Sequence, residues 1–263
     1  MYKNIRRVIL ITISIFIVFT LTSCNNPKEE EKPIEIPKED IEEIVDTLSK
    51  EEQDKIMNEY YQLVTEKTNI EDIVYFIDEN IEKIDKENAE TMVISLEDLL
   101  SSRRTSMEED YALLSKYKEY VSNEIKSYLN LLEEETRNIF TDGEKLNIKS
   151  EEILDRALAA EKHLQEFPKG KKTDIIYDLY MEYIKASIVG TGNQYIFAEE
   201  GSSTIKKEYL DIYKTYIENN KDTKTANILL QYIDLLEKNQ NNMNREEVIR
   251  FYDDLELVIR EQF

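Results

Sequence analysis

SEEILDRALAAEKHLQEFPKGKKTDIIYDLYMEYI, residues 150–184, contains two apolar stripes separated by a turn. Its apolar residues recur three and four positions apart, first around Leu154 and again around Ile176. This spacing is typical of amphipathic helices, in which residues i, i+3, i+4 and i+7 share one face. The segment FPKG at 167–170 contains the residue types that end helices. The stretch therefore predicts an antiparallel helical hairpin whose first helix is capped by Ser150.

The same helical spacing continues on both sides of this hairpin. Capping-box pairs are expected to open three further helices, at Ser49 with Glu52, Thr68 with Glu71 and Asn244 with Glu247. The stretch from Met107 to Phe140 predicts either one helix or two helices broken near Ser122. The remaining apolar stripes are Ile41–Leu48, Ile56–Val64, Ile70–Ile84, Ala89–Leu100, Tyr209–Tyr216, Ile228–Leu236 and Val248–Val258.

The chain shows no convincing alternating strand, and it contains only 5 glycines and 4 prolines. We therefore predict an all-α fold of antiparallel helical hairpins joined by short turns. A turn at Asp142-Gly143 divides an N-terminal helical region, 41–140, from a C-terminal helical hairpin region, 141–263.

An internal similarity relates residues 159–186 to residues 211–238. The matching pairs are Lys162 with Lys214, Glu166 with Glu218, Lys169 with Lys221, Lys172 with Lys224, Thr173 with Thr225, Ile176 with Ile228 and Tyr180 with Tyr232. Self-similar hairpins suggest stacking as in an α-solenoid of the tetratricopeptide kind. Because lysine and glutamate are common in this chain, a chance similarity is the alternative.

The N-terminus has the three zones of an export signal. A basic start with Lys3, Arg6 and Arg7 precedes an apolar run from Val8 to Leu21, which is shorter than the about 20 residues that a spanning helix needs. The run ends in Leu21-Thr22-Ser23-Cys24, which resembles the lipobox of bacterial lipoproteins. The alternatives are an uncleaved anchor or a simple secretory signal.

The lipobox resemblance implies that residues 1–23 are removed and that Cys24 carries a diacylglyceryl group. Two acyl chains give stable anchoring where one gives only marginal binding. The resemblance therefore implies a membrane-attached protein on the extracytoplasmic face. Cys24 is the only cysteine, so neither an intramolecular disulfide nor a cysteine metal cluster can form.

Residues 24–40 are expected to form a tether behind the lipid. The segment holds three of the four prolines and the run Glu29-Glu30-Glu31, a composition that favours an extended chain. Loss of the three basic residues of the signal takes the net charge from −22 to −25. Nucleic acid demands a basic surface, so the charge disfavours nucleic acid as a partner.

The chemistry-bearing residues form no recognisable catalytic motif. The single histidine, His163, cannot build a multi-histidine metal site, and it is expected to be a surface or half-buried helix residue. Carboxylates are so abundant that pairs of them arise by chance. The Asp142-Gly143-Glu144 segment lacks the spacing of a calcium loop, and Gly190-Thr191-Gly192 lacks the lysine of a phosphate loop. No metal and no cofactor is predicted. The seventeen tyrosines are expected to pack in the core with hydroxyls at its rim.

The irregular segment 189–203 is the predicted location of any partner site. It contains three of the five glycines, yet it also carries Asn193, Tyr195 and Phe197. Exposed aromatic side chains on a loop make good binding anchors. The alternative interpretation is that Ile196 and Phe197 fill the core and hold the loop in place.

Residues 150–239 resemble the helical C-terminal part of uncharacterised extracellular proteins from spore-forming Gram-positive bacteria. The residues that carry the resemblance are Leu154-Asp155-Arg156-Ala157 with Glu161, Phe167-Pro168-Lys169-Gly170, Tyr180-Met181-Glu182-Tyr183-Ile184, Gly190 with Ile196-Phe197, Tyr213-Lys214-Thr215-Tyr216-Ile217-Glu218-Asn219-Asn220 and Leu235-Leu236-Glu237-Lys238-Asn239. Those proteins are expected to have Asn-Thr-Pro where this chain has Asn193-Gln194-Tyr195. The resemblance implies an extracellular helical domain and assigns no activity.

The leading functional hypothesis is a helical binding or scaffold module of the cell envelope, attached to the membrane through Cys24 and bound to an envelope protein. A carboxylate-dependent enzyme acting on the cell wall is the first alternative. A solute-binding lipoprotein is the second, and the lack of predicted strands counts against it because such receptors usually have two α/β lobes.

Overall fold

The structure is a computed structural model, and it describes residues 47–66, 69–102, 106–191 and 197–263. In these ranges the chain forms eleven α-helices, two short 3-10 helices and no strand, so the all-α prediction is confirmed. The elements are α1 (Lys50–Thr65), α2 (Ile70–Asn80), η1 (Ile81–Lys83), α3 (Lys86–Ser101), α4 (Met107–Leu114), η2 (Ser115–Tyr117), α5 (Asn123–Arg137), α6 (Ser150–Glu166), α7 (Thr173–Ile188), α8 (Lys207–Asn219), α9 (Lys224–Lys238), α10 (Glu246–Asp253) and α11 (Leu255–Arg260).

The helix boundaries follow the predicted signals to within one residue in most places. The capping box of Ser49 and Glu52 is present at the start of α1. Three predicted starts were wrong by one residue, because the residues that flank α2, α6 and α10 as N-caps are Asn69, Lys149 and Arg245. Ser150 is the first helical residue of α6, and its burial removes it from the exposed capping position.

Two long apolar stripes are each divided between two helices. The stretch from Met107 to Phe140 breaks before Ser122, whose hydroxyl accepts a hydrogen bond from Ile125 N at 3.4 Å and caps α5. The last stripe, predicted as one helix, is split at Asp254 into α10 and α11. The predicted stripe Ile41–Leu48 lies mostly outside the described residues, and Leu48 itself precedes α1.

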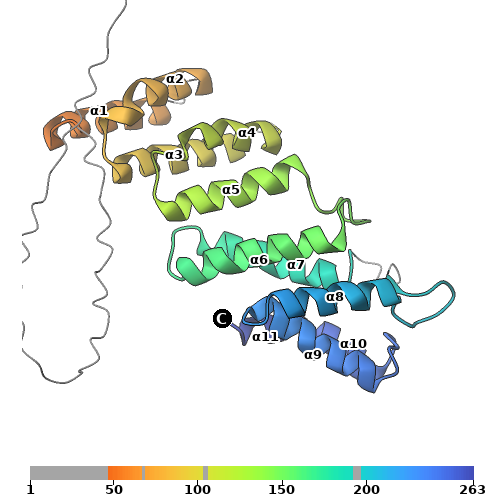
Figure 1. Cartoon of the computed structure of the whole chain (residues 1–263). Coiled ribbons are helices and arrows are strands. Elements are labelled where there is room, and N and C mark those ends of the chain that lie inside the picture. Colours follow the sequence, from red (N-terminus) through yellow and green to blue (C-terminus); the bar gives the residue numbers. More distant parts are fainter. Residues whose placement is uncertain (1–46, 67–68, 103–105, 192–196) are drawn as a thin grey trace, which may run out of the picture. The chain divides into compact units, whose positions relative to one another are not determined.

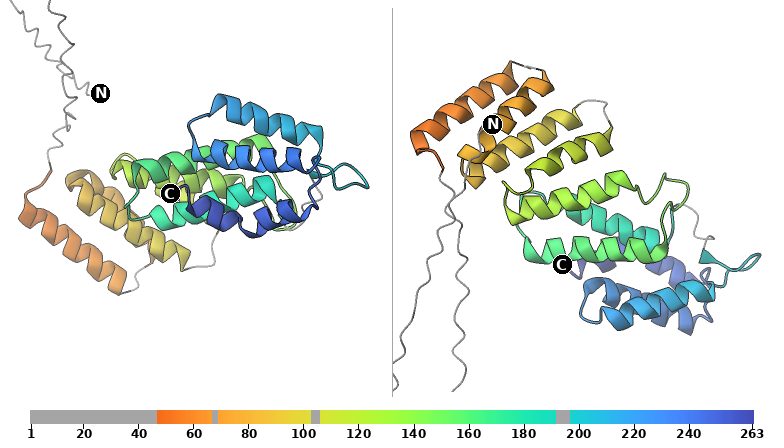
Figure 2. Two further views of the ribbon diagram at one scale, coloured as in Figure 1. Left: turned by 90° about the horizontal axis from the view of Figure 1, so that it is seen from below. Right: turned by 45° about the horizontal axis from the view of Figure 1, so that its top comes forward.

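Residues 45–263 form one compact unit. Consecutive helices of this unit pack against one another from α1 to α7 and again from α8 to α11, as Figures 1 and 2 show. Helix α6 is central because it packs on α5, α7, α8 and α9. Its inner face holds Ile153, Leu154, Ala157 and Ala160, all of which are fully buried.

Long polar side chains of earlier helices cap the starts of later helices. The side-chain oxygen of Gln53 on α1 accepts from Asp85 N at 2.9 Å, and Glu90 on α3 accepts from Ser122 N at 3.1 Å. Asp85 and Ser122 stand directly before α3 and α5. The first turn of a helix has main-chain N–H groups without a partner inside the helix. These contacts satisfy such groups and join helices that are not neighbours in the sequence.

The same arrangement recurs in the C-terminal half. Glu124 on α5 accepts from Lys172 N at 2.9 Å, before the start of α7. The glycine at 170 leaves space for this carboxylate, because a Cβ at Gly170 would overlap it. Glu161 on α6 accepts from Lys224 N at 2.7 Å and from Thr225 N at 2.9 Å, at the start of α9.

The two similar segments are both helix–turn–helix units, α6 with α7 and α8 with α9. The matched apolar pairs Ile176 with Ile228 and Tyr180 with Tyr232 are fully buried in both units. Their identity is therefore explained by equivalent core positions. The stacking of these hairpins as a solenoid stays a prediction.

Candidate functional site

The connection between α7 and α8 contains the predicted partner loop. Of the three predicted site residues, Asn193 and Tyr195 lie outside the described residues, and Phe197 is described. Gly190 and Gly201 have φ angles of 81° and 69°, which is the left-handed region that favours glycine. At these two positions glycine therefore permits a backbone conformation that other residues rarely adopt.

Phe197 holds the returning part of the loop in the core. Its side chain is 0% exposed, and its ring packs edge-to-face on Tyr209 with the centroids 4.7 Å apart. The carbonyl of Phe197 accepts from Lys206 N at 2.8 Å, and Ala198 forms an isolated bridge with Ile205. A ring without exposed surface cannot serve as an anchor for a partner, so the interpretation of Phe197 as a binding residue is replaced by the alternative, core packing.

An open cleft of about 400 Å³ lies beside this loop. One wall comes from the α5–α6 connection and the other from the last turns of α7, with one residue of α10 at the edge. The residues that line it are Phe140, Thr141, Gly143, Glu182, Lys185, Ala186, Val189, Gly190, Thr191 and Tyr252. Val189, Gly190 and Thr191 are the residues of the predicted partner segment 189–203 that line this cleft.

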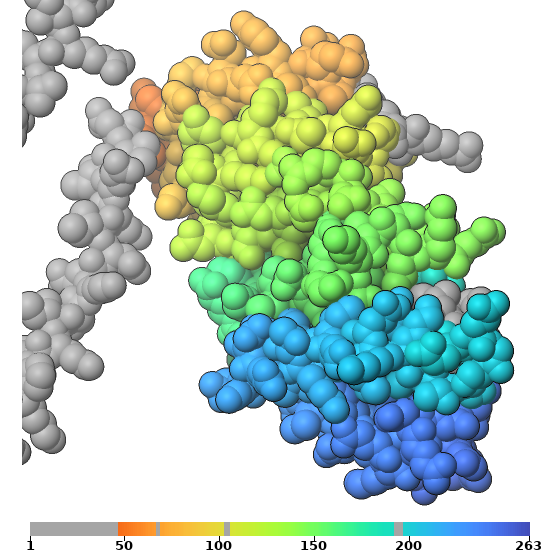
Figure 3. Space-filling view, turned by 45° about the vertical axis from the view of Figure 1, so that its right-hand side comes forward, coloured from red at the N-terminus to blue at the C-terminus, as the bar shows by residue number. Residues whose placement is uncertain are grey.

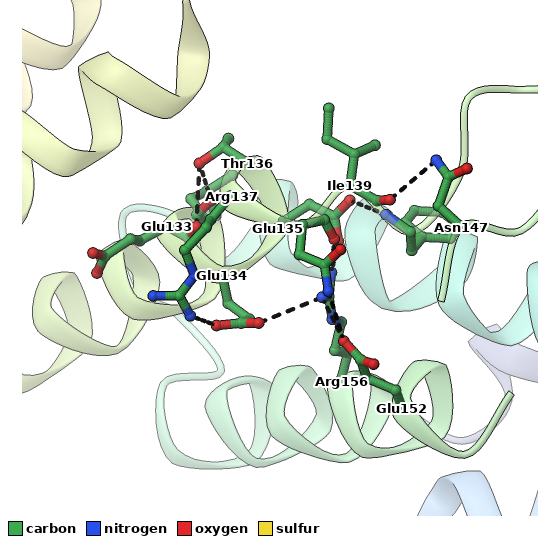
Figure 4. Close-up of polar contacts among 12 residues, drawn as sticks. Glu133, Glu134, Glu135, Thr136, Arg137, Ile139, Asn147, Glu152 and Arg156 are labelled. Carbon is green, nitrogen blue, oxygen red and sulfur yellow. Dashed lines mark hydrogen bonds and ion pairs between the residues drawn. The ribbon is translucent and has the colours of Figure 1, made fainter. Parts of the chain in front are cut away.

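A buried arginine joins the end of α5 to α6 next to this cleft, and Figure 4 shows its polar contacts. The side chain of Arg156 on α6 is 7% exposed and donates to Glu135 at 2.8 Å and to Glu152 at 3.0 Å. It also donates to the main-chain oxygen of Asn138 at 2.9 Å. The Arg156 cluster, meaning Arg156 with Glu134, Glu135 and Glu152, thus fixes the end of α5 to α6.

The electrostatics of the Arg156 cluster favour the ion pair. Burial acts to lower the pKa of Arg156, but the hydrogen bond and the charge of Glu135 outweigh it and raise that pKa. Glu135 also accepts from the Tyr183 hydroxyl at 2.7 Å and from Phe140 N at 3.1 Å. The rings of Phe140 and Tyr183 then meet edge-on, 5.1 Å apart. Through these contacts the cluster positions the cleft residue Phe140.

The cleft offers groups for binding and no assembled catalytic machinery among its described residues. Lys185 and Glu182 supply one charge of each sign and stand 3.5 Å apart, while Thr141 and Thr191 add hydroxyls. The hydroxyl of Tyr252 is 2.8 Å from that of Tyr232. This mixture of an aromatic face with both charge signs suits a peptide or protein surface better than a purely ionic ligand.

His163 differs from its prediction as a surface or half-buried residue, because it is only 1% exposed. Its Nδ1 lies 2.9 Å from the Ser127 hydroxyl, and its ring packs on Phe167 at 5.2 Å. Burial lowers the pKa of His163, against the smaller opposing charges of Glu124 and Glu166. The Nε2 atom has no hydrogen-bond partner in the described structure. The serine–histidine pair is therefore closed to a substrate and joins α5 to α6.

A second buried polar cluster was not foreseen from the sequence. Tyr111 and Tyr128 both donate to Glu97, the first at 2.7 Å, and Lys172 Nζ lies 2.7 Å from the other oxygen of Glu97. Burial raises the pKa of both tyrosines. The prediction of tyrosine hydroxyls at the rim of the core is wrong here. No local spacing indicates this cluster, because its members come from separate helices.

The outer surface beside α8 carries a further shallow groove. On the face drawn in Figure 3, α8 lies below the green segment around residues 130–150, and no deep opening is visible. A groove of about 340 Å³ runs between α6 and α8, with Glu151, Asp155 and Asp211 along it. Its acidic side chains agree with the chain's overall charge.

Comparison with known proteins gives no relative. No family model matches the chain, and neither the curated proteins nor the solved structures contain a significant match. Across the described ranges no helix has both the length and the hydropathy needed to cross a membrane. Among the same residues, no group of three or more histidine, cysteine, aspartate or glutamate side chains is arranged to hold a metal ion.

Proposed function

We propose that this protein is a lipid-anchored binding or scaffold module on the outer face of a bacterial membrane. Its anchor is Cys24, its tether is residues 24–40, and its helical unit holds an envelope protein partner at the cleft beside the 189–203 loop. Support for the anchor comes from the sequence alone, because the signal, Cys24 and the tether lie outside the described residues.

The observation that carries the binding role is the use of the buried polar groups. In the described structure, the carboxylates of Glu135 and Glu161 accept hydrogen bonds from groups of other helices and so join those helices. His163 is buried and has no access to solvent. The cleft, in contrast, is open and lined by groups that are not committed to the core, such as Thr191 and Lys185. An open surface with groups of mixed polarity that the core does not use is suited to recognition of a partner.

The anchor is tested by replacing the lipid acceptor. Cys24→Ser is expected to abolish incorporation of labelled fatty acid and to leave the precursor unprocessed, because the thiol is the group that takes the lipid. Removal of residues 25–39 from the mature chain should barely change its melting temperature, since that segment has no apolar periodicity to bury. Uptake of label by the serine variant would exclude lipidation at Cys24.

The partner is tested by site-specific photo-cross-linking on intact cells. A cross-linker at Lys185, in the cleft, should capture one discrete envelope protein, while a cross-linker at Lys214 should not. Lys214 is the matched control because it is exposed on α8 and pairs with Glu237 outside the cleft. Hydrolysis of purified cell wall by the mature chain would instead support the enzyme, and stabilisation by small solutes would support the solute-binding protein.

A further inference from the structure

A short segment of the chain lies in a groove beside the first half of α7, whereas the cleft described above is lined by the last turns of this helix. Residues 261–263 follow α11 and rest against α7 and α9. Hollows of about 500 Å³ and about 420 Å³ flank the segment. The first is lined by α9 residues including Lys224 and Leu230, and the second by α7 residues including Tyr177. We call this feature the α7/α9 groove.

Two side chains of α9 hold the segment by polar contacts. Lys224 Nζ donates to the main-chain oxygen of Gln262, and Asn227 Nδ2 donates to the side-chain oxygen of Gln262 at 2.7 Å. The first contact recognises a backbone group that every residue type has. The second selects a side chain that can accept a hydrogen bond.

Aromatic contacts hold the next residue. The ring of Phe263 packs edge-on against Tyr177 at 5.7 Å and against Tyr180 at 5.2 Å. Lys224 Nζ also stands 3.9 Å from the centroid of the Phe263 ring, which is close enough for a cation–π attraction. Lys224 therefore contacts both Gln262 and Phe263, and the groove selects an aromatic side chain at the position of Phe263.

The segment fills the groove only in part. Phe263 is 46% exposed, and Leu230 at the groove wall is also 46% exposed. The hydroxyl of Tyr177 is buried and has no hydrogen-bond partner within the described residues. Hydrogen bonds to a backbone carbonyl together with a half-exposed aromatic contact give a weak and exchangeable fit. A neighbouring polypeptide that used the free space in the flanking hollows would bind more tightly.

We propose that the α7/α9 groove is a peptide-binding groove that residues 261–263 occupy as an internal ligand. The external ligand is a segment of a partner polypeptide in which a residue with a hydrogen-bond-accepting side chain precedes an aromatic residue. This proposal rests on the proposed binding function and adds a second contact site with a defined partner chemistry. Because a tethered segment acts at an effective concentration in the millimolar range, the partner must displace it.

The test uses the mature chain shortened to end at Arg260 and an acetylated peptide of residues 260–263, Arg-Glu-Gln-Phe. Calorimetric titration should give a dissociation constant below about 1 mM for the shortened chain, and binding about 10-fold weaker for the full mature chain, whose groove is occupied. The peptide with alanine in place of its phenylalanine should not bind. Unchanged helical circular dichroism of the shortened chain confirms its fold.

Matched lysine variants show whether the groove is the site. In the shortened chain, Lys224→Met should abolish binding of the peptide, while Lys238→Met, at the exposed far end of the same helix, should leave it unchanged. If the shortened chain fails to fold, Phe263→Ala in the full chain vacates the aromatic contact and should regain binding. The proposal would be overturned if the folded shortened chain did not bind the peptide, or if Phe263→Ala did not bind it where shortening prevents folding. It would also be overturned if Lys224→Met bound the peptide as well as the unchanged shortened chain does.

The peptide titration and the cross-linking on cells fail independently. Peptide binding without any envelope cross-link leaves the groove established and removes the proposed envelope function. A cross-link at the cleft without peptide binding keeps the envelope function and removes the groove.

Discussion

Phe197 and Phe263 lie outside the α-helices of the same unit, and the surroundings of the two side chains differ. Each ring packs edge-on against tyrosine, Phe197 on Tyr209 and Phe263 on Tyr177 and Tyr180. Phe197 is 0% exposed, whereas Phe263 is 46% exposed. Aromatic packing alone therefore does not distinguish a core residue from a docked surface segment. The exposed fraction of the side chain distinguishes them.

The largest expected effect separates these two phenylalanines. Phe197→Ala should lower the free energy of unfolding by about 3–5 kcal/mol, because it empties a fully enclosed site. Phe263→Ala should cost about 1 kcal/mol, since roughly half of its surface is already in water. Denaturant unfolding of the two variants measures both values. Equal losses would show that the loop and the segment are held alike.

The cleft beside the 189–203 loop and the α7/α9 groove each depend on a buried charged residue of α6. For the cleft this residue is Arg156. Arg156→Ala should lower the free energy of unfolding by about 3 kcal/mol, because Glu135 would keep its burial without its partner. Arg137→Ala is the control, since Arg137 is 59% exposed and pairs only at the surface with Glu134, and it should cost less than about 0.5 kcal/mol. A small loss in Arg156→Ala would mean that water replaces the arginine.

For the α7/α9 groove the buried charged residue is Glu161. Its carboxylate is 1% exposed and accepts from the main chain of Lys224 and Thr225 at the start of α9, where Lys224 also holds residues 262 and 263. Glu161→Ala should cost about 2 kcal/mol, the range for hydrogen bonds to a charged group. Glu166→Ala, at the exposed end of the same helix, should be nearly neutral. The peptide affinity of the shortened chain should fall in Glu161→Ala, whereas Arg156→Ala should leave it unchanged.

The smallest expected effect concerns His163, which touches neither region. Because burial lowers its pKa below 6.5 in the folded chain, the unfolded chain takes up the proton first as the pH falls. The contribution of His163 is therefore complete above about pH 6.5 and decreases below it. The free energy of unfolding is measured from pH 7.5 to 5 for the native chain and for His163→Gln. The difference between the two profiles isolates the contribution of His163 from that of the carboxylates. Parallel pH profiles would show that the imidazole is not enclosed.

Most of the helices could be predicted from the sequence, because each amphipathic stripe is a local property of one segment. The hairpin of α6 and α7, the capping box at Ser49 and the break before Ser122 all follow from residues within a few positions of each other. The starts of α2, α6 and α10 each lie one residue from the predicted position. Anchoring at Cys24 stays a prediction of the sequence.

Tertiary structure alone decided which polar residues are buried and what they join. In the sequence, Glu97, Glu161 and Arg156 have the pattern of ordinary charged residues on a helix surface. The sequence also did not distinguish a buried Phe197 from an exposed Phe197. The local pattern gives each residue a face of its own helix. It does not say which other elements will pack on that face. Glu161 is buried because it accepts from the N–H groups at the start of α9, and Glu97 is buried because tyrosine hydroxyls of α4 and α5 donate to it.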